Sequence, residues 1–116
     1  MHLDFHERFT NIINKMEEAG DLYAEARGQS YQLQELKGTV LARIMQKIQA
    51  ESSAKIPQGA LEVSAKATPE YEAYINGVSQ AIEKEHKTKN QLEKYKAAFE
   101  ATRSLSSLEK ATIQNT

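Results

Sequence analysis

The sequence predicts an all-α fold, a long antiparallel helical hairpin of the coiled-coil type with a short helical piece in the connecting loop. Three observations lead to this fold class. Apolar residues return every three or four positions over most of the 116-residue chain. No segment alternates apolar and polar residues as a half-buried strand would. The helical pattern fails only over residues 52–67, where Pro57 and Gly59 favour a turn. We therefore expect one helical-hairpin domain covering residues 1–116.

The first predicted helix covers residues 5–51. Its apolar stripe advances in alternating steps of four and three, a period of 3.5 residues that is typical of helices packing along a seam. The stripe consists of Phe5, Phe9, Ile12, Met16, Ala19, Tyr23, Ala26, Ser30 and Leu33. It then continues through Leu36, Val40, Ile44 and Ile48. The small residues Ala26 and Ser30 predict thin packing at the middle of this seam.

Glycines interrupt the first helix, and each costs about 1 kcal/mol relative to alanine. They are Gly20, Gly28 and Gly38. We interpret them as points of close backbone approach or of local bending. The connecting loop is predicted over residues 52–67, with one or two helical turns over residues 60–67.

The second predicted helix covers residues 68–112. Thr68 can cap its first turn, Pro69 suits the first helical position, and Glu70 suits the positive helix end. An apolar face follows at Tyr71, Tyr74, Ile75, Val78, Ala81 and Ile82, and after a polar interval it resumes at Leu92, Tyr95, Phe99, Leu105 and Leu108. We take Leu92 and Phe99 as packing positions, where a charged residue should reduce helicity and assembly together.

Two such helices in one hairpin bury only one narrow seam each, which makes an isolated hairpin marginally stable. The aromatic residues of the second helix also lie on more than one helical face. Self-association would cover those additional faces. We therefore expect a homo-oligomer.

The charge is unevenly distributed although the net charge is only −1. Acids outnumber bases in residues 1–35, and bases outnumber acids in residues 36–66. Such asymmetry can steer an anionic partner locally. The chain has no cysteine, no apolar run long enough to span a membrane, and no apolar signal core at its N-terminus. These features predict a cytoplasmic protein.

The sequence contains no constellation that would support catalysis. His2 and His6 are four residues apart and Glu7 is nearby, which allows a surface metal site, but a helix end that frays holds ligand geometry poorly. The remaining histidine, His86, lies in a solvated stretch. We expect no enzyme activity, no catalytic residue, no metal site, no cofactor and no small-molecule substrate.

The polar interval of residues 83–90 permits two interpretations. One is a solvated helix with pairs four residues apart, such as Glu83–Lys87 and Glu85–Lys89. The other is a surface that faces phosphates, near Tyr71 and Tyr74, which could stack on bases or belong to the core. The candidate nucleic-acid-binding residues are Lys37, Arg43, Lys47, Lys84, Lys87 and Lys89.

The order of several features is familiar. It comprises Tyr31, the segment LKGTVLARIMQK over residues 36–47, Ala60 and Ala65, the segment TPEYEAYI over residues 68–75, Ala81, the Tyr95 and Phe99 pair, and RSLS over residues 103–106. In this order the chain resembles small helical proteins encoded beside recombination genes in tailed phages. More distantly it is similar to the UvsY-type recombination mediators.

The resemblance implies an oligomeric, non-enzymatic protein that binds single-stranded DNA. Such a protein would help a recombinase or annealing protein to displace a single-strand-binding protein, and a phage-encoded chain would act in the host cytoplasm. The alternative is a helical protein–protein interaction module, an adaptor or inhibitor of a host nuclease or defence complex.

Overall fold

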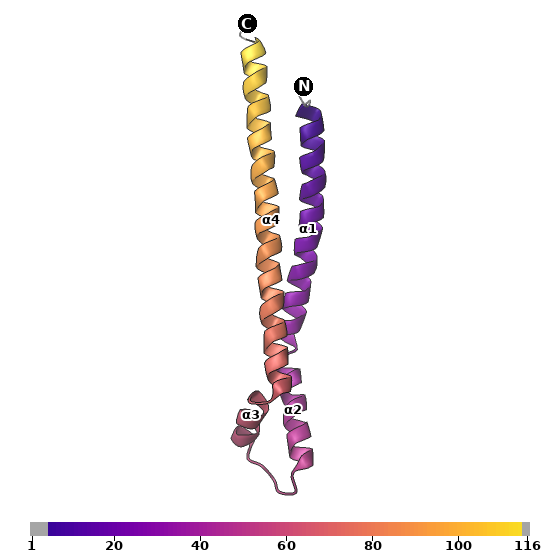
Figure 1. Cartoon of the computed structure of the whole chain (residues 1–116), viewed down its shortest axis with the longest axis vertical. Coiled ribbons are helices and arrows are strands. Elements are labelled where there is room, and N and C mark those ends of the chain that lie inside the picture. The colour runs from indigo at the N-terminus through magenta and orange to yellow at the C-terminus, as the bar shows by residue number, and fades with distance from the viewer. Residues whose placement is uncertain (1–4, 115–116) are drawn as a thin grey trace. The chain divides into compact units, whose positions relative to one another are not determined.

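The computed structural model describes residues 5–114, which form four helices and no strand. Helix α1 covers Phe5–Glu35, α2 covers Lys37–Glu51, α3 covers Gln58–Lys66 and α4 covers Pro69–Gln114. The all-α prediction is confirmed, and so is a hairpin with a short helix in its connection (Figure 1). The chain divides into two compact units. The first joins the N-terminal residues up to Ala26 to the residues from Glu85 onward, and the second runs from Arg27 to Lys84.

In the first unit, the start of α1 and the end of α4 lie side by side with opposite chain directions (Figure 1). Phe9 and Phe99 meet edge to face across this pair, with ring centroids 5.6 Å apart. Such aromatic pairs contribute about 0.5–1.5 kcal/mol beyond the area that they bury. Leu92 and Phe99 are both half-buried, so both predicted packing positions belong to the seam within one chain.

The predicted stripe of α1 is confirmed, because every one of its residues from Phe5 to Leu33 is half-buried or buried. The expectation of thin packing at the small residues is wrong. Ala26 is 1% exposed and Ser30 is 0% exposed, so these are among the most fully covered side chains of the helix. A small side chain at a seam position lets neighbouring side chains close over it, and the Ser30 hydroxyl accepts a 2.9 Å hydrogen bond from Gln34 Nε2.

The single predicted helix over residues 5–51 is in fact two helices, separated at Leu36. The Leu36 N–H donates to both Gln32 O at 3.2 Å and Leu33 O at 3.3 Å, a tight turn typical of a helix end. Leu36 lies outside the buried stripe and is 46% exposed, since the alternating steps of four and three require a step of four after Leu33. Val40, Ile44 and Ile48 keep their predicted places in the packing.

The core of the second unit is formed by residues from α2, α3 and the start of α4: Ile44, Met45, Leu61, Ala65 and Tyr71. Helix α3 lies against α2, as Figure 1 shows. At the end of α1, the Tyr74 hydroxyl donates a hydrogen bond to the Leu33 carbonyl. The Leu33 carbonyl, which also accepts from Leu36 N, thus ties the end of α1 to α4.

The connection is shorter and more helical than predicted. Helix α3 begins at Gln58 rather than near residue 60, and only Ser52–Pro57 link it to α2. The Gln49 side chain holds this link, since its Oε1 accepts from Ile56 N and its Nε2 donates to Ala54 O, both at 3.0 Å. The local sequence pattern cannot reveal a side chain that forms hydrogen bonds with the backbone up to seven residues away.

The start of α4 confirms the predicted cap. Thr68 Oγ1 accepts a 3.2 Å hydrogen bond from Tyr71 N and donates one of 2.7 Å to Ala65 O. One hydroxyl therefore closes α3 and opens α4, and Pro69 is the first residue of α4 as expected.

The buried face of α4 follows a 3.5-residue period without interruption. Its positions, all half-buried or buried, are Tyr71, Tyr74, Val78, Ala81, Glu85, Thr88, Leu92, Tyr95, Phe99, Thr102 and Ser106. The expectation that this face ends on Leu105 and Leu108 is wrong, since they are 52% and 65% exposed. The seam passes through Thr102 and Ser106 instead, because the steps of three and four continue across the polar interval.

The glycines do not mark close backbone approach. A Cβ atom built at Gly20, Gly28 or Gly38 would meet nothing within 4 Å, and no glycine among residues 5–114 has a positive φ. Of these three glycines, only Gly38, two residues after Leu36, lies beside a helix break.

Over residues 5–114, no helix is both long and apolar enough to cross a membrane.

Candidate nucleic-acid interface

The six predicted nucleic-acid-binding residues are all exposed, and they are divided between the two units. Lys37, Arg43 and Lys47 lie on α2 in the second unit, which also contains Lys84. Lys87 and Lys89 lie on α4 in the first unit.

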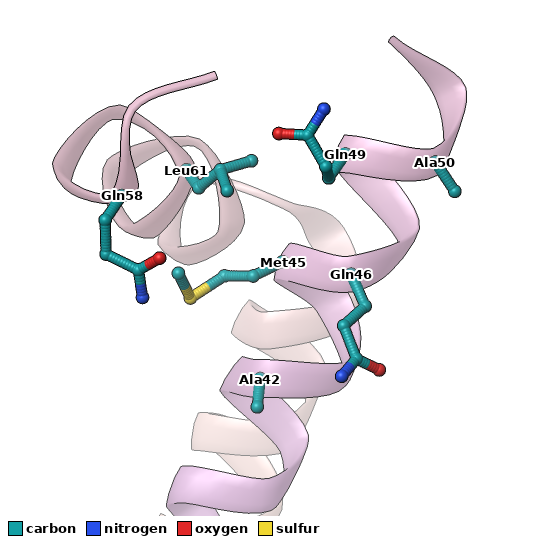
Figure 2. Close-up of a pocket in the computed structure, with 7 residues that line it drawn as sticks. All are labelled: Ala42, Met45, Gln46, Gln49, Ala50, Gln58 and Leu61. Carbon is teal, nitrogen blue, oxygen red and sulfur yellow. The ribbon is translucent and has the colours of Figure 1, made fainter. Parts of the chain in front are cut away.

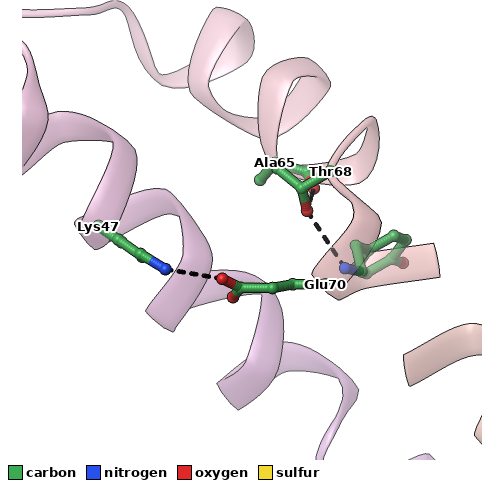
Figure 3. Close-up of polar contacts among 5 residues, drawn as sticks. Lys47, Ala65, Thr68 and Glu70 are labelled. Atoms are coloured by element: carbon green, nitrogen blue, oxygen red, sulfur yellow. Dashed lines mark hydrogen bonds and ion pairs between the residues drawn. The ribbon is translucent and has the colours of Figure 1, made fainter. Parts of the chain in front are cut away.

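Lys47 forms an ion pair with a residue of α4. Its Nζ lies 2.7 Å from Glu70 Oε1, as Figure 3 shows beside the Thr68 cap. The hydrogen bond and the charge of Glu70 raise the pKa of Lys47 above its ordinary value. In the folded chain, the partner of Lys47 is therefore a carboxylate of the same chain. Both side chains are more than half exposed, so the pair is a surface ion pair.

Replacing Glu70 with glutamine should lower the pKa of Lys47 toward its ordinary value, because the charged partner is lost. Because the folded-state pKa is raised, the pair stabilises the fold below the unfolded-state pKa of Lys47. That contribution is lost as the pH rises through the folded-state pKa. NMR titration of the Lys47 side chain measures the shift, with Glu72→Gln as the control on the same helix turn. A Lys47 pKa that is equal in both variants would contradict this role of Glu70.

The two tyrosines considered for base stacking are part of the packing. Tyr71 is 8% exposed, and its ring centroid lies 6.4 Å from that of Tyr74. Burial raises the pKa of Tyr74, whose hydroxyl donates a hydrogen bond to the Leu33 carbonyl. Tyr71 is therefore buried in the core, and Tyr74 is half-buried with its hydroxyl engaged within the chain.

The polar interval is neither wholly solvated nor one basic patch. Glu85 and Thr88 occupy seam positions and are half-buried. The Thr88 hydroxyl is satisfied within the helix by Glu85 O at 3.0 Å. At about 100° per residue, Lys87 and Lys89 point to opposite sides of this seam. One flat phosphate backbone could therefore not contact both lysines from the same direction.

A different set of bases shares one side of α4. Four exposed residues spaced seven apart occupy the same position beside the seam: Lys89, Lys96, Arg103 and Lys110. We call them the basic row. Seven residues of helix advance about 10.5 Å, so the row forms a regular line of cations.

The acids beside the basic row lie one turn back along the helix. Glu93 is 3.7 Å from Lys96 and Glu100 is 3.7 Å from Arg103, both between exposed side chains. Pairs at that distance on a surface contribute about 0–1 kcal/mol, so a phosphate can replace the carboxylate as partner. The net field of the row is weakened but not cancelled.

Sequence reasoning identified only Lys89 of this row as a candidate and missed Lys96, Arg103 and Lys110. The available signal was the seam itself. Extending its steps of three and four from Tyr71 through the polar interval to Ser106 would have placed all four bases at one heptad position.

A second surface feature lies between α2 and α3. It is a groove of about 510 Å³ lined by Ala42, Met45, Gln46, Gln49, Ala50, Gln58 and Leu61. Met45 and Leu61 extend toward each other across it, and glutamines stand at its rim (Figure 2). The lining has no titratable side chain, so the groove offers no acid or base for chemistry.

Among residues 5–114, no group of three or more His, Cys, Asp or Glu side chains could hold a metal ion. His2, one half of the histidine pair considered above, lies outside the described residues. Comparison of the chain with protein-family models, with curated proteins and with solved structures gives no match.

Proposed function

We propose that this chain is a non-enzymatic, single-stranded DNA-binding accessory protein of phage recombination that assists a recombinase or annealing protein. The observation that carries the DNA-binding part is the basic row on one side of α4. The recombination setting rests on the resemblance of residues 31–110 to small helical proteins of phage recombination modules.

The spacing of the basic row suits a nucleic-acid backbone. Exposed cations that repeat about every 10.5 Å along one side of a helix can follow the phosphate backbone of a single strand. The nearby Glu93 and Glu100 repel the same phosphates, so each chain binds weakly. Several associated chains on one strand would gain avidity, because binding through linked sites raises the effective concentration.

Fluorescence anisotropy with a labelled single-stranded oligonucleotide, measured over a salt series, tests this function. Log affinity should fall linearly with log salt at a slope near −0.7 per phosphate contact. Replacing Lys89, Lys96 and Lys110 with glutamine should weaken binding. The salt slope should become shallower by about 2, because three phosphate contacts are lost at about 0.7 each. All three side chains are exposed, so the variant should keep its helicity.

The matched control removes the same charge elsewhere. Lys15, Lys55 and Lys66 are exposed and lie outside α4, and their triple glutamine variant should keep the salt slope of the unmodified protein. Equal losses in both triple variants would show that only net charge matters. Absence of binding at low salt would refute the DNA-binding function.

The second candidate is a helical protein–protein interaction module, an adaptor or inhibitor of a host nuclease or defence complex. The groove between α2 and α3 favours it, because its floor is apolar and its polar rim consists of neutral amides. Such a lining suits the apolar face of a partner rather than a polyanion. A chain that fails to bind oligonucleotides at low salt would leave this function as the better account.

A further inference from the structure

The end of α4 carries an exposed face with no charge. Its residues advance in steps of three and four along a line that lies one residue to the side of the buried seam: Ala98, Ala101, Leu105, Leu108 and Thr112. We call them the neutral stripe. The positions on its outer border are also small and uncharged: Ala97, Ser104 and Ala111. Eight neighbouring positions without a charge are unusual on an exposed helix surface, where polar and charged residues normally predominate.

Helix α4 extends beyond the described part of α1. Both helices rise about 1.5 Å per residue, so the Phe9–Phe99 contact places Phe5 opposite residue 103, approximately. Figure 1 shows the yellow end of α4 continuing past the start of α1. No residue of α1 among those described lies beside Leu105 or Leu108, and their exposure agrees with this.

We infer that the neutral stripe binds the neutral stripe of a second copy of this chain, with the two α4 helices antiparallel about a two-fold axis. The stripe is self-complementary in size. Its first two residues are alanines and its next two are leucines. In the antiparallel arrangement Leu105 faces Ala101 of the second copy, and Leu108 faces Ala98 of the second copy. Each large side chain therefore meets a small one, as close helix packing requires.

The charges that border the stripe also favour this arrangement. Lys94 precedes the uncharged stretch and Glu109 lies near its end. In the antiparallel register, Lys94 of one copy lies about one helical turn from Glu109 of the other, and the two-fold axis makes this contact twice. A parallel pair would instead place Lys94 beside Lys94 and leucine against leucine.

The extent of the surface predicts a dimer of moderate affinity. Residues 98–112 cover about 21 Å of helix, and one helix pair of that length lies at the low end of specific interfaces, near or below about 1,200 Å². The basic row lies on the opposite side of α4, so dimerisation leaves both rows accessible. The accessibility of the basic rows in the dimer matters only for the proposed DNA binding, and the dimer itself does not depend on that proposal.

Sedimentation equilibrium or light scattering over a range of concentrations, without DNA, tests the dimer. The unmodified chain should change from monomer to dimer mass as concentration rises. Leu105→Glu with Leu108→Glu should hold the chain at monomer mass while far-ultraviolet circular dichroism stays unchanged, because both side chains are exposed within one chain. The control Val63→Glu, at a residue 71% exposed on α3, should dimerise normally.

Paired substitutions test the antiparallel register. Ala101→Leu alone should weaken the dimer by placing leucine against leucine, and adding Leu105→Ala should restore it. Likewise Lys94→Glu should weaken association and Glu109→Lys in the same chain should restore it. A chain that is monomeric at every concentration, or a dimer that the leucine and paired variants leave unchanged, would overturn the inference.

The two proposals can fail separately. A monomeric chain that still binds oligonucleotides with the expected salt slope would remove the dimer alone. A dimer that binds no oligonucleotide would remove the DNA-binding function alone.

Discussion

Replacing Phe99 with glutamate should lower the free energy of unfolding by about 2 kcal/mol, roughly half of what a large aromatic side chain contributes in a full core. Phe99 is half-buried and meets Phe9 edge to face. The variant loses this aromatic contact and places a carboxylate in the seam, where its solvation is reduced. Urea or thermal unfolding followed by far-ultraviolet circular dichroism measures the change.

The control for this prediction is Ser107→Glu, which adds the same charge to the exposed surface of the same helix. Substitutions of that kind usually change stability by no more than about 0.5 kcal/mol. A double-mutant cycle with Phe9→Ala and Phe99→Ala isolates the contribution of the ring pair. Equal stability of Phe99→Glu and Ser107→Glu would show that the seam in the first unit contributes little.

Ile44→Ala should destabilise the second unit by about 3 kcal/mol, within the range found for truncating buried aliphatic side chains. Ile44 is 4% exposed and belongs to the cluster that joins α2 to α3 and to the start of α4. A cavity at this point removes contacts from three helices at once. Hydrogen exchange at the amides of α3 should accelerate most, because this nine-residue helix is too short to be stable alone.

Leu36→Ala is the matched control, since it truncates an aliphatic side chain that is 46% exposed at the break between α1 and α2. Its effect should stay below about 1 kcal/mol. A loss for Leu36→Ala as large as that for Ile44→Ala would contradict the boundary of the core described above.

The helix break at Leu36 illustrates why part of the fold could not be read from the sequence. No proline marks the site, and the apolar stripe continues across it through Leu33, Leu36 and Val40. Leu36 is 46% exposed, whereas Ile44 and Met45 belong to the core shared with α3. Their partners there include Leu61 and Ala65, which are distant in the sequence.

The basic row illustrates the corresponding limit for the candidate site. Its four bases are evident in the sequence, but the seam that aligns them emerges only when the steps of three and four are continued through the polar interval. Conversely, Lys47 resembles a free cation in the sequence, and only the folded chain brings Glu70 to within 2.7 Å of it. Partners separated by 23 residues cannot be assigned from local spacing.

By itself, the sequence determined the all-α class, the heptad seam of α1 and the capped start of α4. These features depend on side-chain periodicity and on hydrogen bonds within three residues, which are local interactions. Only the tertiary structure decided the break at Leu36, the extent of α3 and the pairing of Lys47. Each depends on which distant residue lies opposite, and that is set by the register of helices packed against each other rather than by either helix alone.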